Sequence, residues 1–287
     1  MVYSMTGFGK ASFDLHDCNY TIEIKSLNSK QMDVFTRLPN LLKEMEIPLR
    51  KQISDSLLRG KIELNISSSK NEDANSVSIN TDLLQDYYAQ IKDLNLPSND
   101  TLGALLRLPN VLVSEQIQLS TEDKNIVENA LTLAMDELQA FRKVEGLALE
   151  ADLRMRLGLI LEYKQEVKRL APIRIEKLRT RMMDNLKALQ LDLDASSERL
   201  EQEMIFFIEK LDVTEEFVRL KHHCEYFEEV MQNAELTIGK KLNFISQEIG
   251  REINTLGSKA NDAEIQKMVV QMKDELEKIK EQINNVL

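Results

Sequence analysis

The chain has 287 residues, a formal net charge of −11, no tryptophan, nine glycines and five prolines. So few turn-forming residues argue against a many-stranded, turn-rich protein and favour long helices, and 5% aromatic residues argue against an aromatic stacking platform for nucleic acid. Because nucleic-acid-binding proteins are usually basic, a polyanion would have to bind here at local basic patches.

The sequence contains no signal for export or membrane insertion. Its first residues lack a basic segment followed by an apolar one, and no stretch of about twenty uncharged apolar residues occurs. The two cysteines, Cys18 and Cys224, form neither a CxxC pair nor a zinc-binding pattern with histidine. We therefore expect a soluble protein in the reducing cytoplasm.

The N-terminal part predicts several strands. Residues 20–26 and 62–67 alternate apolar and polar side chains, which indicates strands with one buried face. Residues 2–13 are strand-like but contain Gly7 and Gly9, which predicts a bulge or a close approach of another backbone.

A helix is predicted between the later strands. It follows a short strand at 34–38 and spans the apolar spacing at 49–57, with Pro48 in its first turn and Gly60 as its C-terminal stop. The order strand–strand–strand–helix–strand lacks β-α-β alternation, so it predicts the α+β class.

A polar loop is predicted at 67–76, followed by a short strand at 77–79. Asn80 is placed to cap a helix that runs to about residue 92. A second loop at 96–100 and a short helix at 101–108 complete this part.

From residue 121 the pattern is helical. Apolar residues recur every three or four positions from 130 to 160, and Pro172 predicts the end of this long helix. A return helix is predicted at 173–189, then a turn at 192–197 and a new helix that begins at Ser197.

Three amphipathic helices are predicted in the last part of the chain, at 213–234, 238–262 and 264–287. Asp212 and Glu215 resemble a capping box at the start of the first of them. The apolar stripe of the last helix predicts a packing or oligomerisation surface.

These patterns predict three domains. Residues 1–120 form an N-terminal α+β domain, 121–200 a long helical hairpin arm, and 201–287 a C-terminal helical domain with the candidate active-site helix.

One face of the helix at 238–262 carries charges of both signs. Its members recur every three or four positions, so they can touch: Glu248, Arg251, Glu252, Thr255, Lys259 and Asp262. Carboxylates can hold a hard divalent cation, and Arg or Lys can hold a phosphate. The alternative interpretation is an ordinary salt-bridged, solvated face.

Residues 168–181 are the most basic segment, with six basic residues against Glu176. This segment is either a polyanion contact or a solvated hairpin end. His222 and His223 are candidates for a general acid or base or a metal ligand, with Asp212 or Glu216 to orient the ring. The alternative is that both histidines are merely exposed.

Several familiar site motifs are absent. The sequence has no Walker-type phosphate loop, no GxGxxG, no GxSxG and no HExxH. Three histidines cannot form a histidine-rich metal cage, so any metal site would be lined by oxygen and would suit Mg²⁺ or Mn²⁺.

Runs of residues at both ends and in the middle of the chain are similar to one known family, which residues 71–136 resemble only in general layout. They are 4–9 (SMTGFG), 23–28 (EIKSLN), 37–39 (RLP), 59–61 (RGK), 145–146 (EG), 212–220 (DVTEEFVRL) and 247–261 (QEIGREINTLGSKAN). The chain thus resembles the YicC/YloC family of bacterial endoribonucleases. The resemblance implies cytoplasmic RNA cleavage that depends on a divalent cation, and a ring-like homo-oligomer, a hexamer.

With this resemblance, specific roles can be assigned as hypotheses. The expected catalytic residues are Glu248, Glu252, His222, Arg251 and Lys259. The expected ligands of Mg²⁺ or Mn²⁺ are Glu248, Glu252, Asp212 and Glu216. The expected RNA contacts are Lys25, Asn28, Arg37, Lys61, Arg174, Arg181, Arg219, Asn254 and Ser258.

Three points stay open at this stage. The attacking group is either water or the 2′-hydroxyl of the RNA itself. The protein is alternatively a non-catalytic RNA-binding or chaperone ring, in which the polar face grips phosphate without cutting. A second alternative is a coiled-coil scaffold for a protein partner, with no RNA affinity.

Overall fold

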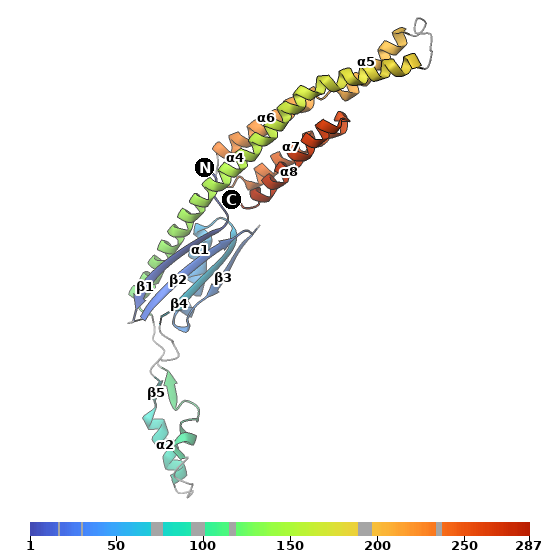
Figure 1. Cartoon of the computed structure of the whole chain (residues 1–287). Coiled ribbons are helices and arrows are strands. Elements are labelled where there is room, and N and C mark those ends of the chain that lie inside the picture. Colours follow the sequence, from blue (N-terminus) through green and yellow to red (C-terminus); the bar gives the residue numbers. More distant parts are fainter. Residues whose placement is uncertain are drawn as a thin grey trace. The chain divides into compact units, whose positions relative to one another are not determined.

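The computed structural model describes most of the chain, namely residues 1–16, 18–29, 31–69, 77–92, 101–114, 119–188, 197–233 and 237–287. They form two compact units (Figure 1). The sheet unit comprises Phe8–Gln139, and the helical unit comprises Met1–Gly7 together with Ala140–Leu287. The predicted three-domain division stays a prediction.

The sheet unit is built on four strands: β1 (Gly7–Leu15), β2 (Cys18–Leu27), β3 (Met32–Arg37) and β4 (Gly60–Ser68). Their order in the sheet is β1-β2-β4-β3, with β4 antiparallel to β2 and parallel to β3. The period-two segments of the sequence lie in β2 and β4, so these strand predictions and the α+β class are confirmed.

Helices cover the apolar face of this sheet. A 3₁₀ turn, η1 (Asn40–Met45), leads into α1 (Glu46–Ser56), which has Pro48 in its first turn as predicted. Gly60 does not end α1, because the helix already closes at an extended Leu57 and Gly60 begins β4. Leu49 of α1 joins one core with the inward residues of β2 and β4.

Gly9 lies where two backbones meet, as the sequence predicted. A Cβ atom at this position would be 1.9 Å from the carbonyl oxygen of Ala134. Only a residue without a side chain allows β1 to come this close to the helix that contains Ala134.

A small hairpin and two helices belong to the same unit. β5 (Val77–Ile79) pairs with β6 (Leu112–Ser114), and α2 (Thr81–Ile91) begins where the side chain of Asn80 accepts a hydrogen bond from the backbone of Leu83, as predicted. α3 (Thr101–Leu105) is shorter than predicted. Most of the loop predicted at 67–76, and all of that at 96–100, lies outside the described residues.

The long helix α4 (Thr121–Ala188) is continuous through Pro172, so the predicted break and the separate return helix are wrong. Proline in a helix interior costs about 3 kcal/mol. Here the buried stripe continues on both sides of it, at Val167, Ala171 and Arg174, and packing offsets that cost. Residues 192–196 of the turn predicted at 192–197 lie outside the described residues.

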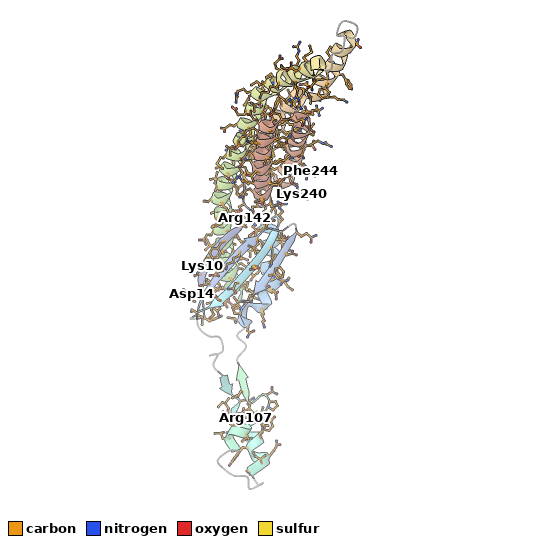
Figure 2. All side chains as sticks on the ribbon, turned by 45° about the vertical axis from the view of Figure 1, so that its right-hand side comes forward. Lys10, Asp14, Arg107, Arg142, Lys240 and Phe244 are labelled. Atoms are coloured by element: carbon orange, nitrogen blue, oxygen red, sulfur yellow. The ribbon has the colours of Figure 1, made fainter. Side chains whose placement is uncertain are left out.

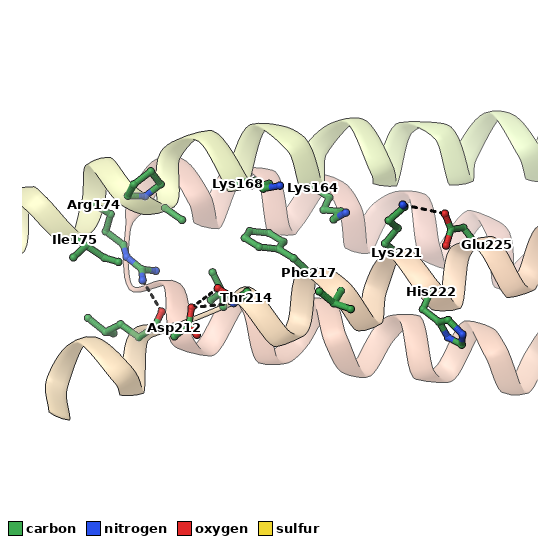
Figure 3. A pocket seen from close by; sticks show the side chains of 15 residues that line it. Lys164, Lys168, Arg174, Ile175, Asp212, Thr214, Phe217, Lys221, His222 and Glu225 are labelled. Carbon is green, nitrogen blue, oxygen red and sulfur yellow. Dashed lines mark hydrogen bonds and ion pairs between the residues drawn. The ribbon is translucent and has the colours of Figure 1, made fainter. Parts of the chain in front are cut away.

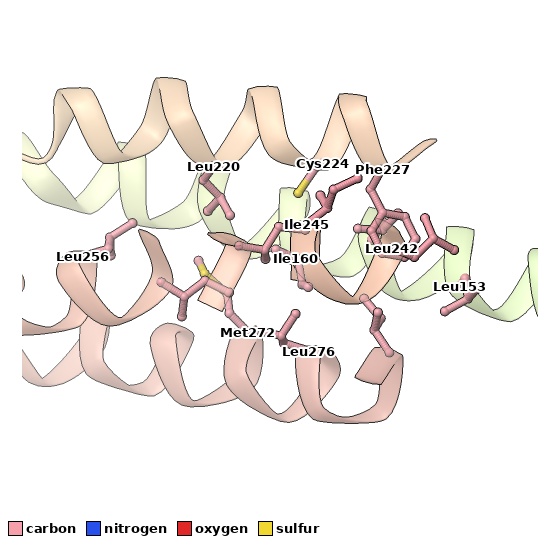
Figure 4. Close-up of a cluster of buried hydrophobic side chains, with 14 of the residues drawn as sticks. Leu153, Ile160, Leu220, Cys224, Phe227, Leu242, Ile245, Leu256, Met272 and Leu276 are labelled. Carbon is pink, nitrogen blue, oxygen red and sulfur yellow. The ribbon is translucent and has the colours of Figure 1, made fainter. Parts of the chain in front are cut away.

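Four further helices complete the helical unit: α5 (Ser197–Leu211), α6 (Thr214–Gln232), α7 (Gly239–Ala260) and α8 (Ala263–Ile283). Figure 4 shows apolar side chains of α4, α6, α7 and α8 meeting in one core, including Ile160, Phe227, Leu242 and Leu276. The predicted stripes of the last three helices are therefore buried within this unit.

The start of α6 differs from the predicted capping box. The helix begins one residue later, and Asp212 accepts hydrogen bonds from the backbone N–H and the hydroxyl of Thr214, at 3.1 and 2.6 Å. Glu215 pairs with Arg219 instead of reaching back to the cap. When an aspartate carboxylate accepts a hydrogen bond from the residue two positions later, it forms a local turn that competes with a capping box.

The first seven residues belong to the helical unit, which the sequence did not indicate. The backbone of Leu287 donates to the carbonyl of Tyr3, and Ser4 forms a bridge with Val286. Arg142 of α4, labelled in Figure 2, is buried and donates to the carbonyl of Met5 at 3.3 Å. Burial lowers the pKa of Arg142 to about 10.

Among the described residues, none of the helices has both the length and the apolar character that a membrane crossing requires.

Candidate functional site

A buried ion pair joins the start of α6 to the end of α7. Nζ of Lys259 lies 2.8 Å from Oε1 of Glu216, whose residue is only 4% exposed. The other carboxylate oxygen of Glu216 is buried and has no hydrogen-bond partner among the described residues. Lys259 therefore supplies the charge balance of this carboxylate.

Asp212 lies close enough to this pair to be influenced by it. The hydrogen bond from the Thr214 hydroxyl, backbone N–H groups and the charge of Lys259 hold the pKa of Asp212 below its ordinary value. Asp212, Glu216 and Lys259 thus form a charged cluster at the α6–α7 contact.

Arg174 of α4 holds two helix ends in place. Its guanidinium donates to the carbonyl oxygen of Ala260, the last residue of α7, at 2.8 Å. It also donates to the carbonyl oxygen of Leu211, the last residue of α5, at 2.7 Å (Figure 3). Burial lowers its pKa. Carbonyls at helix C-termini lack partners within their own helix, so Arg174 satisfies them. The structure places this predicted RNA contact inside the protein as a positioning residue.

The polar face of α7 is divided between solvent and interior. Glu248 and Arg251 lie on the surface with 3.4 Å between their charged atoms, and the Arg251 side chain is 73% exposed. Glu252, one turn after Glu248, is only 4% exposed. No hydrogen bond or ion pair joins the Glu252 side chain to another residue in the described part of the chain.

The four expected metal ligands do not form one cluster. Throughout the described residues, no group of three or more His, Cys, Asp or Glu side chains is placed to hold a metal ion. Glu248 and Glu252 remain adjacent on α7, whereas Glu216 and Asp212 are occupied by Lys259 and Thr214.

His222 is exposed on α6, and its ring lies 6.0 Å from that of His223 in an edge-on arrangement. Within the described residues, no hydrogen bond or ion pair joins it to the expected partners Asp212 or Glu216. The expected RNA contacts Asn254 and Ser258 are exposed on α7, and the Ser258 hydroxyl donates to the carbonyl of Thr255.

The remaining expected contacts of the helical unit are on its surface. Arg219 forms an ion pair with Glu215 one turn before it on α6. Arg181 is exposed on α4 and lines a shallow hollow of about 600 Å³ on that helix.

In the sheet unit, the structure brings three expected RNA contacts onto one face. Lys25 pairs in register with Glu63 of β4, and the alternation of the strands puts Lys61 and Arg37 on that same face, opposite the core. The Lys61 ammonium lies 5.1 Å from the ring centre of Phe35. Asn28 is exposed just after β2.

A pocket of about 620 Å³ in the helical unit was not indicated by the sequence analysis. It lies between α4 and α6, and Figure 3 shows three lysines that point into it, Lys164, Lys168 and Lys221. Lys164 is 5% exposed; burial, followed by the charges of Lys221 and Lys168, lowers its pKa. We refer to this cavity between α4 and α6 as the lysine pocket.

A signal for this pocket was present in the sequence. Lys164 falls within the apolar stripe of α4, between Ile160 and Val167, both of which are fully buried. A lysine at a core position of an amphipathic helix is unusual, because burying an unpaired ammonium is costly.

Two family models match almost the whole chain. One, described as "Endoribonuclease YicC-like, N-terminal region", matches residues 2–151, and one described as "Endoribonuclease YicC-like, C-terminal" matches residues 167–287.

Two relatives match at full length. The chain is 30% identical over 299 residues to the protein named "Probable endoribonuclease YicC" of Clostridioides difficile (strain 630), across the whole of both chains. It is also 30% identical over 294 residues, again across both chains, to the protein of the same name from Haemophilus influenzae. The resemblance seen in the sequence motifs is confirmed, and the chain belongs to the YicC-like endoribonuclease family.

Proposed function

We propose that this protein is a cytoplasmic, metal-dependent endoribonuclease, a hydrolase that cuts internal phosphodiester bonds of single-stranded or structured RNA. Its family and the names of its relatives support RNA as the substrate. The observation that carries the metal dependence is Glu252, a residue only 4% exposed whose carboxylate has no cation of its own in the described part of the chain.

The residues on α7 fit a hard divalent cation, Mg²⁺ or Mn²⁺. Most of the Glu252 residue is buried, and in the described part of the chain its carboxylate has no ion-pair partner, so a bound cation would balance its charge. Glu248 precedes Glu252 by one helical turn, so the two can share one ion. Magnesium is commonly held by one or two carboxylates, with water and substrate phosphate as further ligands, so this pair is sufficient.

Glu216 and Asp212, the other two expected metal ligands, have a different role in this proposal. Glu216 and Asp212 would have to leave Lys259 and Thr214 to reach the ion. We assign them instead to holding Lys259 and the start of α6 in place beside the α7 face.

The side chains on this face suit the needs of phosphodiester cleavage. When bound, the cation would neutralise charge that develops on the phosphoryl oxygens. Arg251 is exposed and would grip a phosphate in a bidentate manner, with Lys259 as a second contact. His222 would transfer a proton at the reacting hydroxyl or at the leaving oxygen.

Contacts away from this face would hold the rest of the RNA. On the helical unit, Asn254, Ser258, Arg219 and Arg181 are exposed and suited to sugar or phosphate. On the sheet unit, Lys25, Asn28, Arg37 and Lys61 would bind the backbone, and Phe35 beside Lys61 offers a ring for stacking.

We further propose that the protein is a homo-oligomer, specifically a hexameric ring. Three consecutive apolar side chains of α5, Ile205, Phe206 and Phe207, are 58%, 54% and 43% exposed. Exposed apolar patches commonly mark interaction surfaces. Light scattering coupled to size-exclusion chromatography would measure the number of subunits, and a monomer at micromolar concentration would contradict the ring.

A cleavage assay tests the proposed activity. A structured RNA is incubated with the protein and no metal, Mg²⁺ or Mn²⁺, and the same is done with Glu248→Gln/Glu252→Gln. We expect internal cuts that need the metal and that the double variant reduces by a factor of about 100 or more. The matched control is Glu229→Gln, which removes an exposed carboxylate of α6 and should leave the rate unchanged.

The products and the other outcomes decide between mechanisms. A 2′,3′-cyclic phosphate beside a 5′-hydroxyl end would identify the 2′-hydroxyl as the attacking group, and a 3′-hydroxyl beside a 5′-phosphate end would identify water. Equal cleavage and equal metal dependence in the double variant would refute the metal role. Tight RNA binding without cuts would favour the non-catalytic ring, and no RNA affinity would favour the scaffold.

A further inference from the structure

We propose that the lysine pocket between α4 and α6 is a binding site for a phosphate monoester, separate from the face of α7. Lys164, Lys168 and Lys221 point into one cavity of about 620 Å³, and Lys164 is 95% buried there (Figure 3). Within the described residues, no carboxylate forms an ion pair with Lys164 or Lys168.

The Lys164 ammonium faces the pocket without an ion-pair partner among the described residues, and this requires an explanation. Removing a lysine from water is costly unless a partner offsets the loss of hydration. Burial lowers the pKa of Lys164, and the positive charges of Lys221 and Lys168 lower it further, while the negative charge of Glu225 has a smaller, opposite effect. A bound anion would offset these penalties, since it would neutralise the ammonium and screen it from the neighbouring lysines.

The charge of the pocket selects the kind of anion. Its lining contains four cationic side chains, Lys164, Lys168, Arg174 and Lys221, and two carboxylates. The carboxylate of Glu225 pairs with Lys221 at 3.3 Å, and that of Asp212 accepts hydrogen bonds from Thr214. The net charge of +2 matches a phosphate monoester, which carries about −1.5 to −2 at neutral pH, better than a diester with one charge.

The shape of the cavity fits a phosphate at the end of a larger molecule. Lysines bind phosphate as flexible point charges and need no fixed fork geometry. Phe217, Val218 and Pro172 line the same cavity and offer apolar surface beside the lysines. A nucleoside attached to the phosphate could pack against that surface, so two sources have the required chemistry: the 5′-phosphorylated end of an RNA, and a free mononucleotide or inorganic phosphate.

The test measures binding, not cleavage, in the Glu248→Gln/Glu252→Gln background, so that it does not depend on the proposed catalytic activity. Inorganic phosphate, AMP and adenosine are added separately, and the thermal unfolding midpoint is recorded. Two RNAs of one sequence, with a 5′-phosphate or a 5′-hydroxyl, are then compared by fluorescence anisotropy at low salt.

We expect phosphate and AMP to raise the unfolding midpoint and adenosine to have no effect. If the natural source is RNA, the 5′-phosphorylated RNA should bind about tenfold more tightly than the 5′-hydroxyl form. If it is a free nucleotide, the two RNAs should bind equally while AMP still stabilises the protein.

Three single variants locate the site. Lys164→Met and Lys168→Gln should abolish the effects of phosphate and AMP, whereas Lys143→Gln, on the exposed side of the same helix, should preserve them. Lys164→Met removes an unpaired buried charge, so it should fold with an unchanged or higher midpoint in the absence of ligand. A lower midpoint would mean that the ammonium has a structural partner, and would overturn the proposal.

Two further results would also overturn it. One is the absence of any phosphate or AMP effect together with equal affinity for the two RNAs. The other is an equal effect in the parent protein and in both pocket variants, because the anion would then bind elsewhere.

Discussion

At the level of single residues, the ion pair between Glu216 and Lys259 joins the start of α6 to the end of α7. Replacing Lys259 with Met leaves the Glu216 carboxylate buried without its cation, with one oxygen already lacking a partner among the described residues. We expect the free energy of unfolding, measured by urea denaturation, to fall by about 3–5 kcal/mol.

The control for this prediction is the double variant Glu216→Gln/Lys259→Met. It removes both charges, so it should be more stable than Lys259→Met alone. Its loss of unfolding free energy should therefore be smaller than the sum of the losses in Lys259→Met and Glu216→Gln. Additive losses would mean that the two side chains do not interact in solution.

Among the structural elements, α4 depends on one glycine where the N-terminal segment crosses it. A Cβ atom at Gly146 would lie 2.1 Å from the carbonyl oxygen of Val2, and one at Gly158 would meet nothing within 4 Å. We expect Gly146→Ala to lower the unfolding midpoint, because two backbones must separate to admit the methyl group.

Gly158→Ala is the matched control in the same helix. It should stabilise the protein by about 0.5–1 kcal/mol, since alanine favours a helix over glycine and the added methyl group meets open space. If both substitutions stabilised α4, the N-terminal segment would not be held against this helix in solution.

At the scale of the whole molecule, a net charge of −11 has to coexist with RNA binding. Lys25, Arg37 and Lys61, the proposed RNA contacts of the sheet unit, lie on one face of the sheet. Glu23, Asp33 and Glu63 lie on that face too, and Lys61 forms an ion pair with Glu63 at 3.1 Å. We expect Lys25→Glu/Lys61→Glu to weaken RNA affinity and to reduce the slope of log K against log salt by about 0.7 for each phosphate that the variant no longer neutralises. Titrations at several salt concentrations measure both quantities.

The comparison variant for that prediction is Lys267→Glu/Lys273→Glu, which reverses two exposed lysines of α8 in the helical unit. It changes the net charge by the same amount without touching this face of the sheet, so the slope should stay the same. An equal reduction in affinity for both variants would indicate that total charge, and not a local patch, governs RNA binding.

The sequence was most informative where a pattern depends on near neighbours. The alternation in β2 and β4, the cap at Asn80 and the buried stripe of α6 were all predictable because strand, cap and helix periodicities involve residues a few positions apart. Family membership was predictable from short runs such as residues 247–261.

Pro172 marks the limit of that local information. Its missing N–H predicts a break, but the stripe formed by Val167, Ala171 and Arg174 packs against helices that come later in the chain, and α4 continues. The stabilisation from this packing is distributed over many distant residues, so no window of sequence contains it.

The candidate site shows the same division between local and distant causes. That Glu248, Arg251 and Glu252 follow one another around a helix could be predicted from the sequence, because helical spacing is a local property. The burial of Glu252, the pairing of Lys259 with Glu216 and the capping of two helices by Arg174 depend instead on how distant helices pack. Burial and long-range pairing determine whether a charge meets water, a partner or neither, and they arise only when elements from distant parts of the chain pack together.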